Sequence, residues 1–486
     1  MPPYKGFIGQ SNSSLSPIAD QELTVNMYLE RAESEGAISP LVAYSIPGFQ
    51  TIATVPNVGV GRGHFELGGR EFLVVGATLY EVNKLGVFTV LGTVATDGNP
   101  VTWASNGDAG NQILLTSGGN AYVLNTSTNA FAEVANLNGL AYQCCGVNNY
   151  ALVLDRATST IYVSDLSDFA TFDLGNFIQR SQAPDPWVAI GVSGKYLYFL
   201  GTQTGECWFN QFAEGSDVGV PFTPTSAGVF NYGIIAPFSF KVVGDAAFWL
   251  GSTVNGQGMV LRAPGLRPEV VSTNAMQVQI QGFSTISDAI GDAHEIFDHD
   301  IYTLSFPNEN RTIAFDDAGE ASNWTDRGFW NTATGQYEAW RPLFHAFAFE
   351  EARFLDRASG KLYRMSDAYA TDVDGSGIRW MRRAPTILNE NKMLFWGDFE
   401  VVCQVGIGLT TGQGSDPQIM MQFSNDGGRT WSAELWRTMG AIGKYDQRVR
   451  WTRGGRGRKR VYQVAGSDPV RVMLAGAIIN PAASTE

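Results

Sequence analysis

Residues 71–82 read EFLVVGATLYEV, and this short stretch sets the pattern that decides the fold. An apolar run, Phe72–Val75, leads through a small turn at Gly76 to a second apolar run, which begins at Leu79 and carries Tyr80 near its start. Two short apolar runs with a turn residue between them are typical of a β-hairpin. The same unit recurs along the chain at 113–124, 150–163, 196–209, 247–261, 301–315 and 353–364.

The spacing of these units predicts a β-propeller. Corresponding aromatic or apolar residues stand at positions 72, 113, 150, 196, 247, 302 and 354, so the steps are 41, 37, 46, 51, 55 and 52 residues. Hairpins repeated every ~40–50 residues are the signature of propeller blades. One blade cannot bury both of its faces, so the units must close into a ring. We expect an all-β fold with six or seven blades; the alternative is a stack of β-sandwich domains.

The repeat occupies only the middle of the chain. Before it, residues 1–60 are loop-like and read as an extended arm that crosses other structure. After Arg383-Ala384-Pro385 the repeat stops, and later apolar runs predict a separate β-sandwich-like domain. Its expected strands are Phe399–Cys403, Gln418–Phe423, Val461–Val464 and Val470–Ile479. The expected division is an arm over 1–60, a propeller over 61–384 and a sandwich-like domain over 385–486.

Composition and charge exclude several classes of protein. Of 486 residues, 44% are hydrophobic, 16% are charged and 55 residues are Gly, which fits a turn-rich β protein better than a disordered chain. The chain carries 47 Asp and Glu against 33 Lys and Arg, a net charge of −14, whereas general nucleic-acid binders are usually basic. An acidic surface suits a passage along which DNA slides, because it neutralises no phosphates.

Targeting signals and covalent cross-links are not expected. Four cysteines are too few for a disulfide framework in a chain of this length, so we expect them to be reduced and mostly buried. Met1–Gly6 lacks the basic and apolar regions of a signal peptide. No run of about 18 apolar residues occurs, so no membrane span is expected. The cysteines are Cys144, Cys145, Cys207 and Cys403.

Ser424–Trp431, SNDGGRTW, matches the Asp-box turn S-x-D-x-G-x-x-W. In this turn Asp426 caps backbone amides, Gly428 takes a positive φ and Trp431 packs beneath. Asp-boxes are common in sialidase propellers, but a sialidase also needs three arginines on the substrate carboxylate and a tyrosine nucleophile. Here a single box, starting at Ser424, lies outside the repeats. The sequence therefore predicts a structural turn without catalytic residues.

Two further motifs resemble metal sites and fail on their chemistry. Asp372–Gly377 starts like a calcium loop, yet Arg383 stands at the twelfth position, where a bidentate Glu is required, so a solvated turn is expected. His294–His299 approaches the zinc motif H-E-x-x-H, but its second His comes one place too late for the rings to share a helix face. The sequence predicts no metal, no cofactor and no enzymatic activity.

A positive cluster stands between Lys444 and Arg460 in this acidic chain. Arg448 and Arg450 alternate, so a strand would present both on one face. Three interpretations stay open: a charged, solvated hairpin, a docking face that orients association, and direct contact with DNA phosphates. In an acidic protein we rank docking above DNA contact. The candidate docking residues are Arg448, Arg450, Arg453, Arg456, Arg458 and Arg460.

An ordered series of short motifs gives the chain a resemblance to the tail nozzle, or packaged-DNA stabilisation protein, of short-tailed bacteriophages (podoviruses). The series is Val25-Asn26-Met27, Pro47-Gly48-Phe49, Ser164-Asp165-Leu166, Gln182-Ala183-Pro184-Asp185, Phe199-Leu200-Gly201, Asn425-Asp426-Gly427, Tyr445–Trp451 and Gly455–Arg458. The resemblance spans nearly the whole chain and is most specific in the terminal segment. It does not extend to the loops between 251 and 300.

The resemblance implies a non-enzymatic virion protein that is made in the host cytoplasm. In such phages the nozzle is a homohexamer below the portal and adaptor rings. It closes the DNA channel after packaging, passes double-stranded DNA without sequence specificity, and holds a needle or plug beside tailspikes or fibres. By this resemblance, residues 1–60 and 385–486 form a platform that meets the adaptor, and charge reversal of Arg448 and Arg450 should weaken attachment. The alternative is a glycan-binding or glycan-cleaving propeller that acts in receptor binding.

Overall fold

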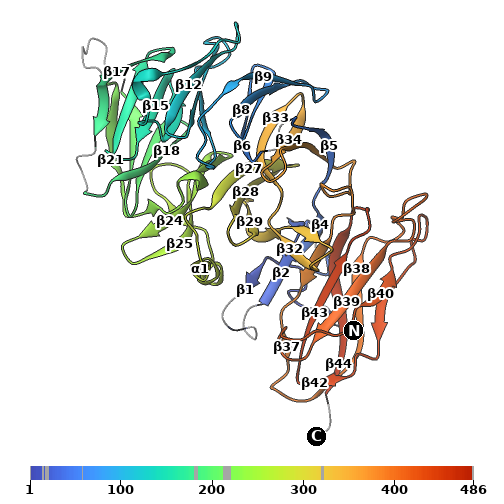
Figure 1. Ribbon diagram of the computed structural model, residues 1–486. Coiled ribbons are helices and arrows are strands. Elements are labelled where there is room, and N and C mark those ends of the chain that lie inside the picture. Colours follow the sequence, from blue (N-terminus) through green and yellow to red (C-terminus); the bar gives the residue numbers. More distant parts are fainter. Residues whose placement is uncertain are drawn as a thin grey trace.

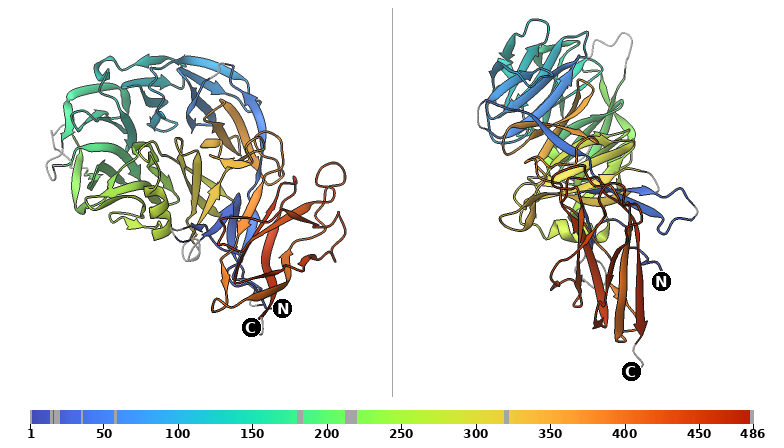
Figure 2. Two further views of the ribbon diagram at one scale, coloured as in Figure 1. Left: turned by 60° about the horizontal axis from the view of Figure 1, so that its bottom comes forward. Right: turned by 90° about the vertical axis from the view of Figure 1, so that its right-hand side faces the viewer.

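The chain folds almost entirely as β-structure, in two parts (Figure 1). The computed structural model describes residues 2–13, 16, 21–34, 36–56, 59–179, 184–211, 220–318 and 322–483. Gln182 and Ala183, which belong to one of the motifs above, lie outside the described residues. A ring of blades forms the larger part and a two-sheet sandwich forms the smaller part (Figures 1 and 2).

Within the described residues the ring has seven blades. Blades 1 to 3 consist of β6 (Gly61–Leu67), β7 (Arg70–Val75), β8 (Thr78–Val82) and β9 (Phe88–Thr93), then β10 (Thr102–Ser105), β11 (Gln112–Ser117), β12 (Asn120–Asn125) and β13 (Phe131–Glu133), then β14 (Gln143–Val147), β15 (Tyr150–Asp155), β16 (Thr160–Asp165) and β17 (Asp168–Gln179). Blade 4 consists of β18 (Trp187–Ser193), β19 (Tyr196–Gly201), β20 (Gly205–Asn210) and β21 (Phe222–Phe230).

Blades 5 to 7 complete the ring. They consist of β22 (Gly233–Ile234), β23 (Lys241–Val243), β24 (Ala246–Thr253), β25 (Gly256–Ala263) and β26 (Glu269–Val270), then β27 (Ile290–Ile296), β28 (His299–Phe306), β29 (Arg311–Asp316) and β30 (Asn323–Arg327), then β33 (Pro342–Ala348), β34 (Glu351–Asp356), β35 (Lys361–Ser366) and β5 (Gly48–Thr54). All seven predicted hairpins are present, each as the two middle strands of a blade's sheet; in blade 5 these are β24 and β25, because both β22 and β23 pair with the edge of β24 that faces away from β25.

The predicted hairpins were visible because central blade strands are apolar without alternation. Phe72–Val75 of β7 and Leu197–Leu200 of β19 are buried at every position. Neighbouring blades cover such strands on both faces, so both sets of side chains leave water. The hydrophobic effect at about 25 cal/mol per Å² of buried apolar surface favours this closed ring over separate sheets.

An N-terminal strand closes the ring. β5 pairs antiparallel with β35 of the last blade, from Gly48 opposite Ser366 to Thr54 opposite Lys361. Phe49 is 2% exposed, and its ring packs edge-on against those of Trp340, Phe354 and Tyr363. The first and last segments of the propeller are therefore held in one sheet.

A buried ion pair lies at the same closure. Arg353 Nη1 of β34 donates to Glu71 Oε2 of β7 at 2.7 Å, and both side chains are fully buried. His64 Nε2 lies 2.8 Å from the other oxygen, Oε1, of Glu71. Removing one member of such a network leaves an uncompensated buried charge, which is strongly destabilising. The network therefore ties blade 7 to blade 1 through polar contacts as well as apolar ones.

The sandwich combines the C-terminal segment with the N-terminal arm, as predicted, but the expectation that residues 1–60 are loop-like is wrong, because the arm contributes β1 to β5. Its first sheet runs β2 (Gln21–Val25), β36 (Trp380–Arg383), β43 (Lys459–Gly466), β39 (Gln418–Ser424) and β40 (Leu435–Thr438), with β1 (Asn12–Ser13) beside β2 and β37 (Ile387–Leu388) beside β43. Its second sheet runs β3 (Met27–Arg31), β4 (Leu41–Ser45), β44 (Met473–Ala483), β38 (Leu394–Cys403) and β41 (Val449–Thr452), with β42 (Arg456–Gly457) beside β38. Met27, Phe399, Ile419, Tyr462 and Leu474 meet in one core between the sheets.

One continuous sheet joins the two parts. β30, the last strand of blade 6, pairs in parallel with β2 at Val25 and Asp326, so the sheet of blade 6 runs on into the sandwich. The Asn26 side chain donates to Gly328 O at 2.7 Å and accepts from Gly328 N at 3.0 Å. Buried Arg327 donates to Met27 O at 2.9 Å. These bonds hold the propeller against the sandwich.

The predicted domain limits at residues 60/61 and 384/385 stay a prediction. Strand pairing argues for earlier limits, since β5 belongs to blade 7 and β36 belongs to the sandwich. The small hairpin of β31 (Phe329–Asn331) and β32 (Gln336–Glu338) stands between blades 6 and 7 in the chain. The described helices are η1 (Ala135–Leu137), η2 (Pro237–Ser239) and α1 (Asn274–Gln281). None of these is long and apolar enough to cross a membrane.

Replacing Phe49 by Ala should open the ring closure. The change removes a fully buried aromatic side chain, so we expect the propeller to lose about 3–5 kcal/mol of stability. Differential scanning calorimetry would show this as a lower-temperature transition. The matched control is Leu85→Ala at an 83% exposed position, where the loss should stay within about 0.5 kcal/mol. Equal melting of both variants would show that β5 does not hold the ring.

Candidate functional site

The predicted docking arginines separate into three groups on the sandwich. The first group is Arg448 and Arg450, which are already paired within the chain. Arg448 Nε donates to Glu400 Oε1 at 2.9 Å, and Arg450 Nη2 donates to Asp398 Oδ2 at 2.6 Å. Hydrogen bonds from Arg448 hold the pKa of Glu400 below its ordinary value. These two arginines fasten the edge strand β41 to β38, and much of their charge is neutralised.

Arg460 forms the second group, and it lies inside the sandwich. Its side chain is fully buried, with Nε donating to Asn425 Oδ1 at 2.9 Å and Nη2 donating to Gly454 O at 2.8 Å. The guanidinium carbon lies 4.1 Å from the ring centroid of Phe423 and 5.0 Å from that of Trp396. Buried and stacked in this way, Arg460 has no surface through which to meet a partner.

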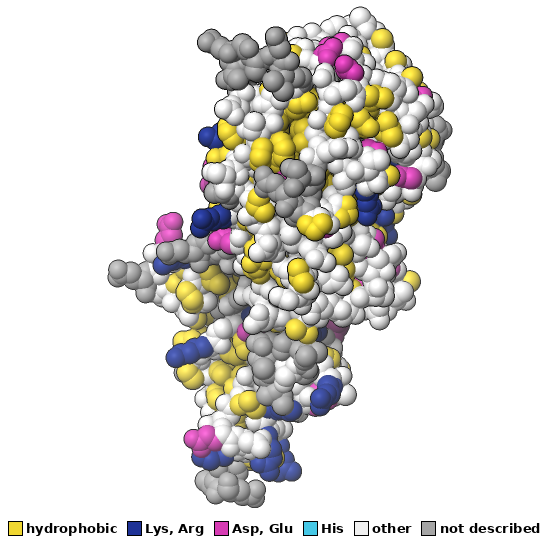
Figure 3. Space-filling model, turned by 90° about the vertical axis from the view of Figure 1, so that its left-hand side faces the viewer, with side chains coloured by type: hydrophobic (Ala, Val, Ile, Leu, Met, Phe, Trp, Pro, Cys, Tyr) yellow, Lys and Arg dark blue, Asp and Glu magenta, His cyan; other side chains and the backbone are white. Residues whose placement is uncertain are grey.

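The third group is Arg453, Arg456 and Arg458, which are exposed and form no ion pair with any described residue. Phe395, 49% exposed, lines a groove of about 520 Å³ with Arg453 and Arg456. Leu388, 47% exposed, lines a second groove with Arg458. We call these five residues the basic tip. Figure 1 places β37 and β42, which carry part of it, at the end of the sandwich away from the propeller, and Figure 3 shows Lys and Arg side chains exposed at that end.

Charge is divided unevenly between the two parts of the chain. Residues 61–384 contain 33 Asp and Glu against 19 Lys and Arg, a net charge of −14. Residues 385–486 contain 9 acidic residues against 12 basic ones, a net charge of +3. An asymmetry of this kind steers and orients a molecule as it approaches charged partners.

The Asp-box turn joins β39 to the segment before β40. Asp426 accepts from Arg429 N at 2.9 Å and from Thr430 N at 3.0 Å, and Ser424 Oγ donates to it at 2.6 Å. These bonds hold the pKa of Asp426 well below its ordinary value. Gly428 has φ +86°, and its carbonyl accepts from Trp431 Nε1 at 3.1 Å. The geometry is that of a tight turn, and we infer a structural role for it.

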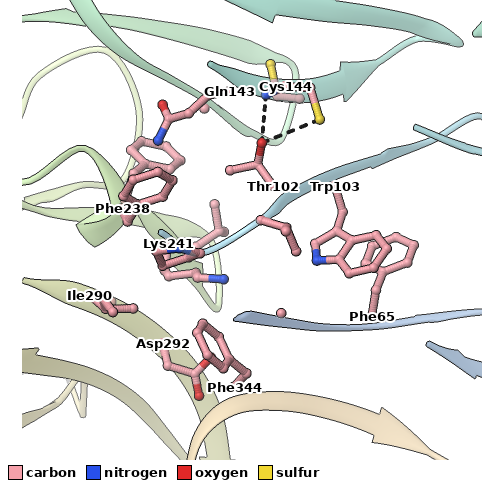
Figure 4. Close-up of a pocket in the computed structure, with 18 of the residues that line it drawn as sticks. Phe65, Thr102, Trp103, Gln143, Cys144, Phe238, Lys241, Ile290, Asp292 and Phe344 are labelled. Atoms are coloured by element: carbon pink, nitrogen blue, oxygen red, sulfur yellow. Dashed lines mark hydrogen bonds between the residues drawn. The ribbon is translucent and has the colours of Figure 1, made fainter. Parts of the chain in front are cut away.

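The innermost strands of all seven blades enclose a central cavity of about 410 Å³ (Figure 4). Its wall is partly aromatic and partly polar. Phe65 and Trp103 stack with their ring centroids 5.5 Å apart and their planes 8° apart. The other labelled residues in Figure 4 are Thr102, Gln143, Cys144, Phe238, Lys241, Ile290, Asp292 and Phe344.

Asp292 and Lys241 are the charged groups drawn in this cavity. Asp292 is 3% exposed, and its Oδ1 accepts from His345 N at 3.2 Å. Its Oδ2 has no hydrogen-bond partner among the described residues. Burial raises the pKa of Asp292 to about 7, while the nearby positive charge of Lys241 acts in the opposite direction. Lys241 itself forms no ion pair with a described residue.

The two metal-like motifs do not assemble ligands. His294 is buried against the rings of Trp340 and Phe354, and burial lowers its pKa well below its ordinary value. In the second motif Asp374 is exposed, as expected for a solvated turn. That expectation is wrong for Asp372, which is buried and has its pKa raised to about 7 by desolvation. No group of three or more His, Cys, Asp and Glu side chains in the described part of the chain could hold a metal ion.

The described cysteines are unpaired and poorly reactive. Cys144, Cys145 and Cys207 are buried and Cys403 is partly buried. Burial raises the pKa of the Cys144 thiol to about 11 and that of Cys207 to about 12. A thiol with a raised pKa is rarely present as the nucleophilic thiolate.

Sequence reasoning missed the central cavity. The hairpin units mark the middle strands of each blade, whereas the cavity is lined by the strand that precedes each hairpin. The available signal was a charged residue in an apolar segment just before a hairpin, as at Lys241 and Asp292. Only the closed ring brings such positions together.

Two family models match this chain. The model described as "Bacteriophage P22 Gp10, beta-propeller" matches residues 18–370. The model described as "Bacteriophage P22 Gp10, beta-sandwich" matches residues 379–481. No curated protein matches the sequence.

Solved structures give weak matches. Virginiamycin B lyase from Staphylococcus aureus is 12% identical over 65% of this chain and 98% of its own, with a TM-score of 0.41. The N-terminal domain of Nup159 is 11% identical over 72% and 98%, with a TM-score of 0.41. The computationally designed protein Ika8 is 11% identical over 74% and 99%, with a TM-score of 0.36.

Replacing Asp292 by Asn should change how stability depends on pH. The folded-state pKa of about 7 exceeds the ordinary value of about 3.9, so between these values the folded chain binds a proton that the unfolded chain lacks. Stability therefore falls as pH rises through this window, and Asn removes the effect. We expect the difference in melting temperature, variant minus wild type, to increase as the pH rises from 5 to 8.

The groups that face Asp292 have to be considered in this experiment. Lys241, His64 and His345 contribute to its electrostatic environment, and burial lowers the pKa of His345 to about 4, below this pH range. Asp108→Asn, at an exposed position, is the control and should show the same pH profile as wild type. An Asp292→Asn profile that runs parallel to wild type from pH 5 to pH 8 would contradict the raised pKa.

Proposed function

This chain belongs to the bacteriophage P22 Gp10 family of phage tail structural proteins, and from that premise we propose that it forms the nozzle of a short phage tail. As a member of this family it is a virion protein that assembles with other phage proteins. The nozzle role is supported by the match of both family models, in order, over 18–370 and 379–481. The continuous sheet between the two parts suits a rigid wall element.

We propose that six copies form a ring and that the DNA channel lies between them. The cavity inside one propeller, about 410 Å³, is within the range of about 300–1,000 Å³ that is usual for small-molecule pockets. Such a cavity cannot pass a DNA duplex, so a channel needs several copies around it. The net charge of −14 on residues 61–384 would let DNA slide without phosphate neutralisation.

The proposed ring lies below the portal and adaptor rings and closes the channel after packaging, so that the genome is retained until ejection. It also supports a needle or plug and the tailspikes or fibres. In this arrangement residues 1–60 and 385–486 act as the platform toward the adaptor. The protein acts as a structural component and not as an enzyme.

The basic tip is the part of the predicted docking set that is best suited to a partner. Arg453, Arg456 and Arg458 carry unpaired charge beside two exposed apolar side chains. Ion pairs with Glu400 and Asp398 neutralise much of the charge of Arg448 and Arg450. We therefore propose that Arg453, Arg456 and Arg458 contact the adaptor or a neighbouring copy, while Arg448 and Arg450 hold β41 in place.

Reversing Arg453, Arg456 and Arg458 to Glu should block ring assembly on the adaptor. Like charges facing each other across an interface cost several kcal/mol, so binding should weaken at least about tenfold. Native mass spectrometry of the full chain, alone and with its adaptor ring, would measure the change. Wild type should show six copies, at least when the adaptor is present.

The matched control is the double swap Arg448→Glu with Glu400→Arg, which keeps an ion pair at the same place. It should assemble as wild type does. Assembly of six copies by the triple variant would remove the basic tip from the interface. A wild-type chain that stays monomeric with the adaptor would contradict the nozzle itself.

A further inference from the structure

The central cavity holds two opposite charges that the fold does not join. Lys241 stands on β23 and Asp292 on β27, the inner strands of blades 5 and 6. Both side chains line the same cavity, and in Figure 4 the label of Lys241 stands above that of Asp292. No ion pair connects them, and Asp292 Oδ2 has no partner among the described residues. A buried carboxylate oxygen without a hydrogen bond is costly unless something else supplies one.

Other polar groups around the cavity are already used by the protein. Gln143 Nε2 donates to Pro237 O at 2.9 Å, and its Oε1 accepts from Ile190 N at 3.2 Å. Thr102 Oγ1 accepts from Cys144 N at 2.8 Å. By contrast, Trp103 Nε1 is buried without a partner among the described residues. His345 Nδ1 donates to Ala293 O at 3.1 Å, and the Nε2 of this neutral ring is likewise buried without a partner among the described residues. The cavity therefore presents two free donors, Lys241 Nζ and Trp103 Nε1, and two free acceptors, Asp292 Oδ2 and His345 Nε2.

The charges of Lys241 and Asp292 limit the classes of ligand that the cavity can bind. A simple cation would be repelled by Lys241, and a simple anion would be repelled by the carboxylate of Asp292. A neutral molecule with several hydroxyl groups fits both, because one hydroxyl donates to Asp292 Oδ2 while another oxygen accepts from Lys241 Nζ. The stacked rings of Phe65 and Trp103 offer an apolar wall for the carbon face of such a molecule.

We propose that the central cavity of the propeller binds a neutral sugar residue. Lys241 and Asp292 hold its hydroxyl groups, Trp103 Nε1 offers a third hydrogen bond, and the aromatic wall packs against its ring. The volume of about 410 Å³ is within the range of small-ligand pockets. The site is separate from the basic tip and does not depend on the ring of six copies.

Saturation-transfer NMR on the full chain tests this site. The probes are D-glucose, D-galactose, D-mannose, L-rhamnose and N-acetyl-D-glucosamine, with glycine as a zwitterion that could also bridge the two charges. At least one sugar should receive saturation. Lys241→Met and Asp292→Asn should each weaken its binding about tenfold or more, since each removes a charged hydrogen-bond partner. Lys195→Met, at an exposed blade turn, is the matched control and should bind as wild type does.

Each outcome decides the proposal. Binding should also be weaker at pH 5.5 than at pH 8, because protonation of Asp292 replaces a charged acceptor by a neutral carboxyl group, which accepts a weaker hydrogen bond from a hydroxyl. No saturation of any of the five sugars, equal binding by the Lys241→Met variant, or binding of glycine alone would overturn it. Circular dichroism checks the fold of both variants; if Asp292→Asn does not fold, Lys241→Met decides. Failure here leaves the nozzle proposal untouched, since assembly on the adaptor is measured separately.

Discussion

The structure depends on the closure of the propeller ring by β5, a strand that precedes blade 1 in the sequence but pairs with β35 of blade 7. The N-terminal arm first supplies β2, β3 and β4 to the sandwich and then becomes β5 of blade 7. One short segment therefore both shuts the propeller and ties it to its neighbour. The buried pair of Glu71 and Arg353 strengthens the same closure from inside. Because blade faces are apolar on both sides, an open ring would expose two such faces to water. The arm is thus a structural part of the propeller, although it lies far from most of the blades in sequence.

The junction between the two parts explains how they can act as one body. A sheet that runs from blade 6 through β30 and β2 leaves no flexible linker at this point. Hydrogen bonds from Asn26 and Arg327 fix the turn between the strands. In the nozzle proposed above, a connection of this kind would make the two parts move together. It also keeps the acidic propeller and the basic tip at a fixed separation, which gives the molecule a defined electrical polarity.

Burial and pairing, more than the number of charges, decide which cations can act outward. Six arginines within thirteen residues look equivalent as a sequence, yet one is buried among aromatic rings and two fasten neighbouring strands. The remaining three lie beside exposed Phe395 and Leu388. Pairing with a carboxylate inside the chain lowers the binding free energy that an arginine contributes at an interface, because the partner must compete with the existing ion pair. The same principle applies in the central cavity, where the side chain of Gln143 already makes two hydrogen bonds and Asp292 Oδ2 makes none with a described residue.

The sequence by itself determined the repeated hairpins, the all-β class, the presence of a β-sandwich after the repeat and the acidic character of the propeller. These follow from local patterns: apolar runs mark strands buried on both faces, and glycine-rich turns separate them. The Asp-box turn was equally local, since eight consecutive residues contain all of its bonds. Only the tertiary structure decided that the propeller has seven blades and that β5 closes it. It also decided that Arg448 is paired, Arg453 exposed and Arg460 buried. It also decided that Lys241 and Asp292 face one cavity. Each of these depends on which distant segments meet, and a single sequence does not encode contacts across a ring in any short-range pattern.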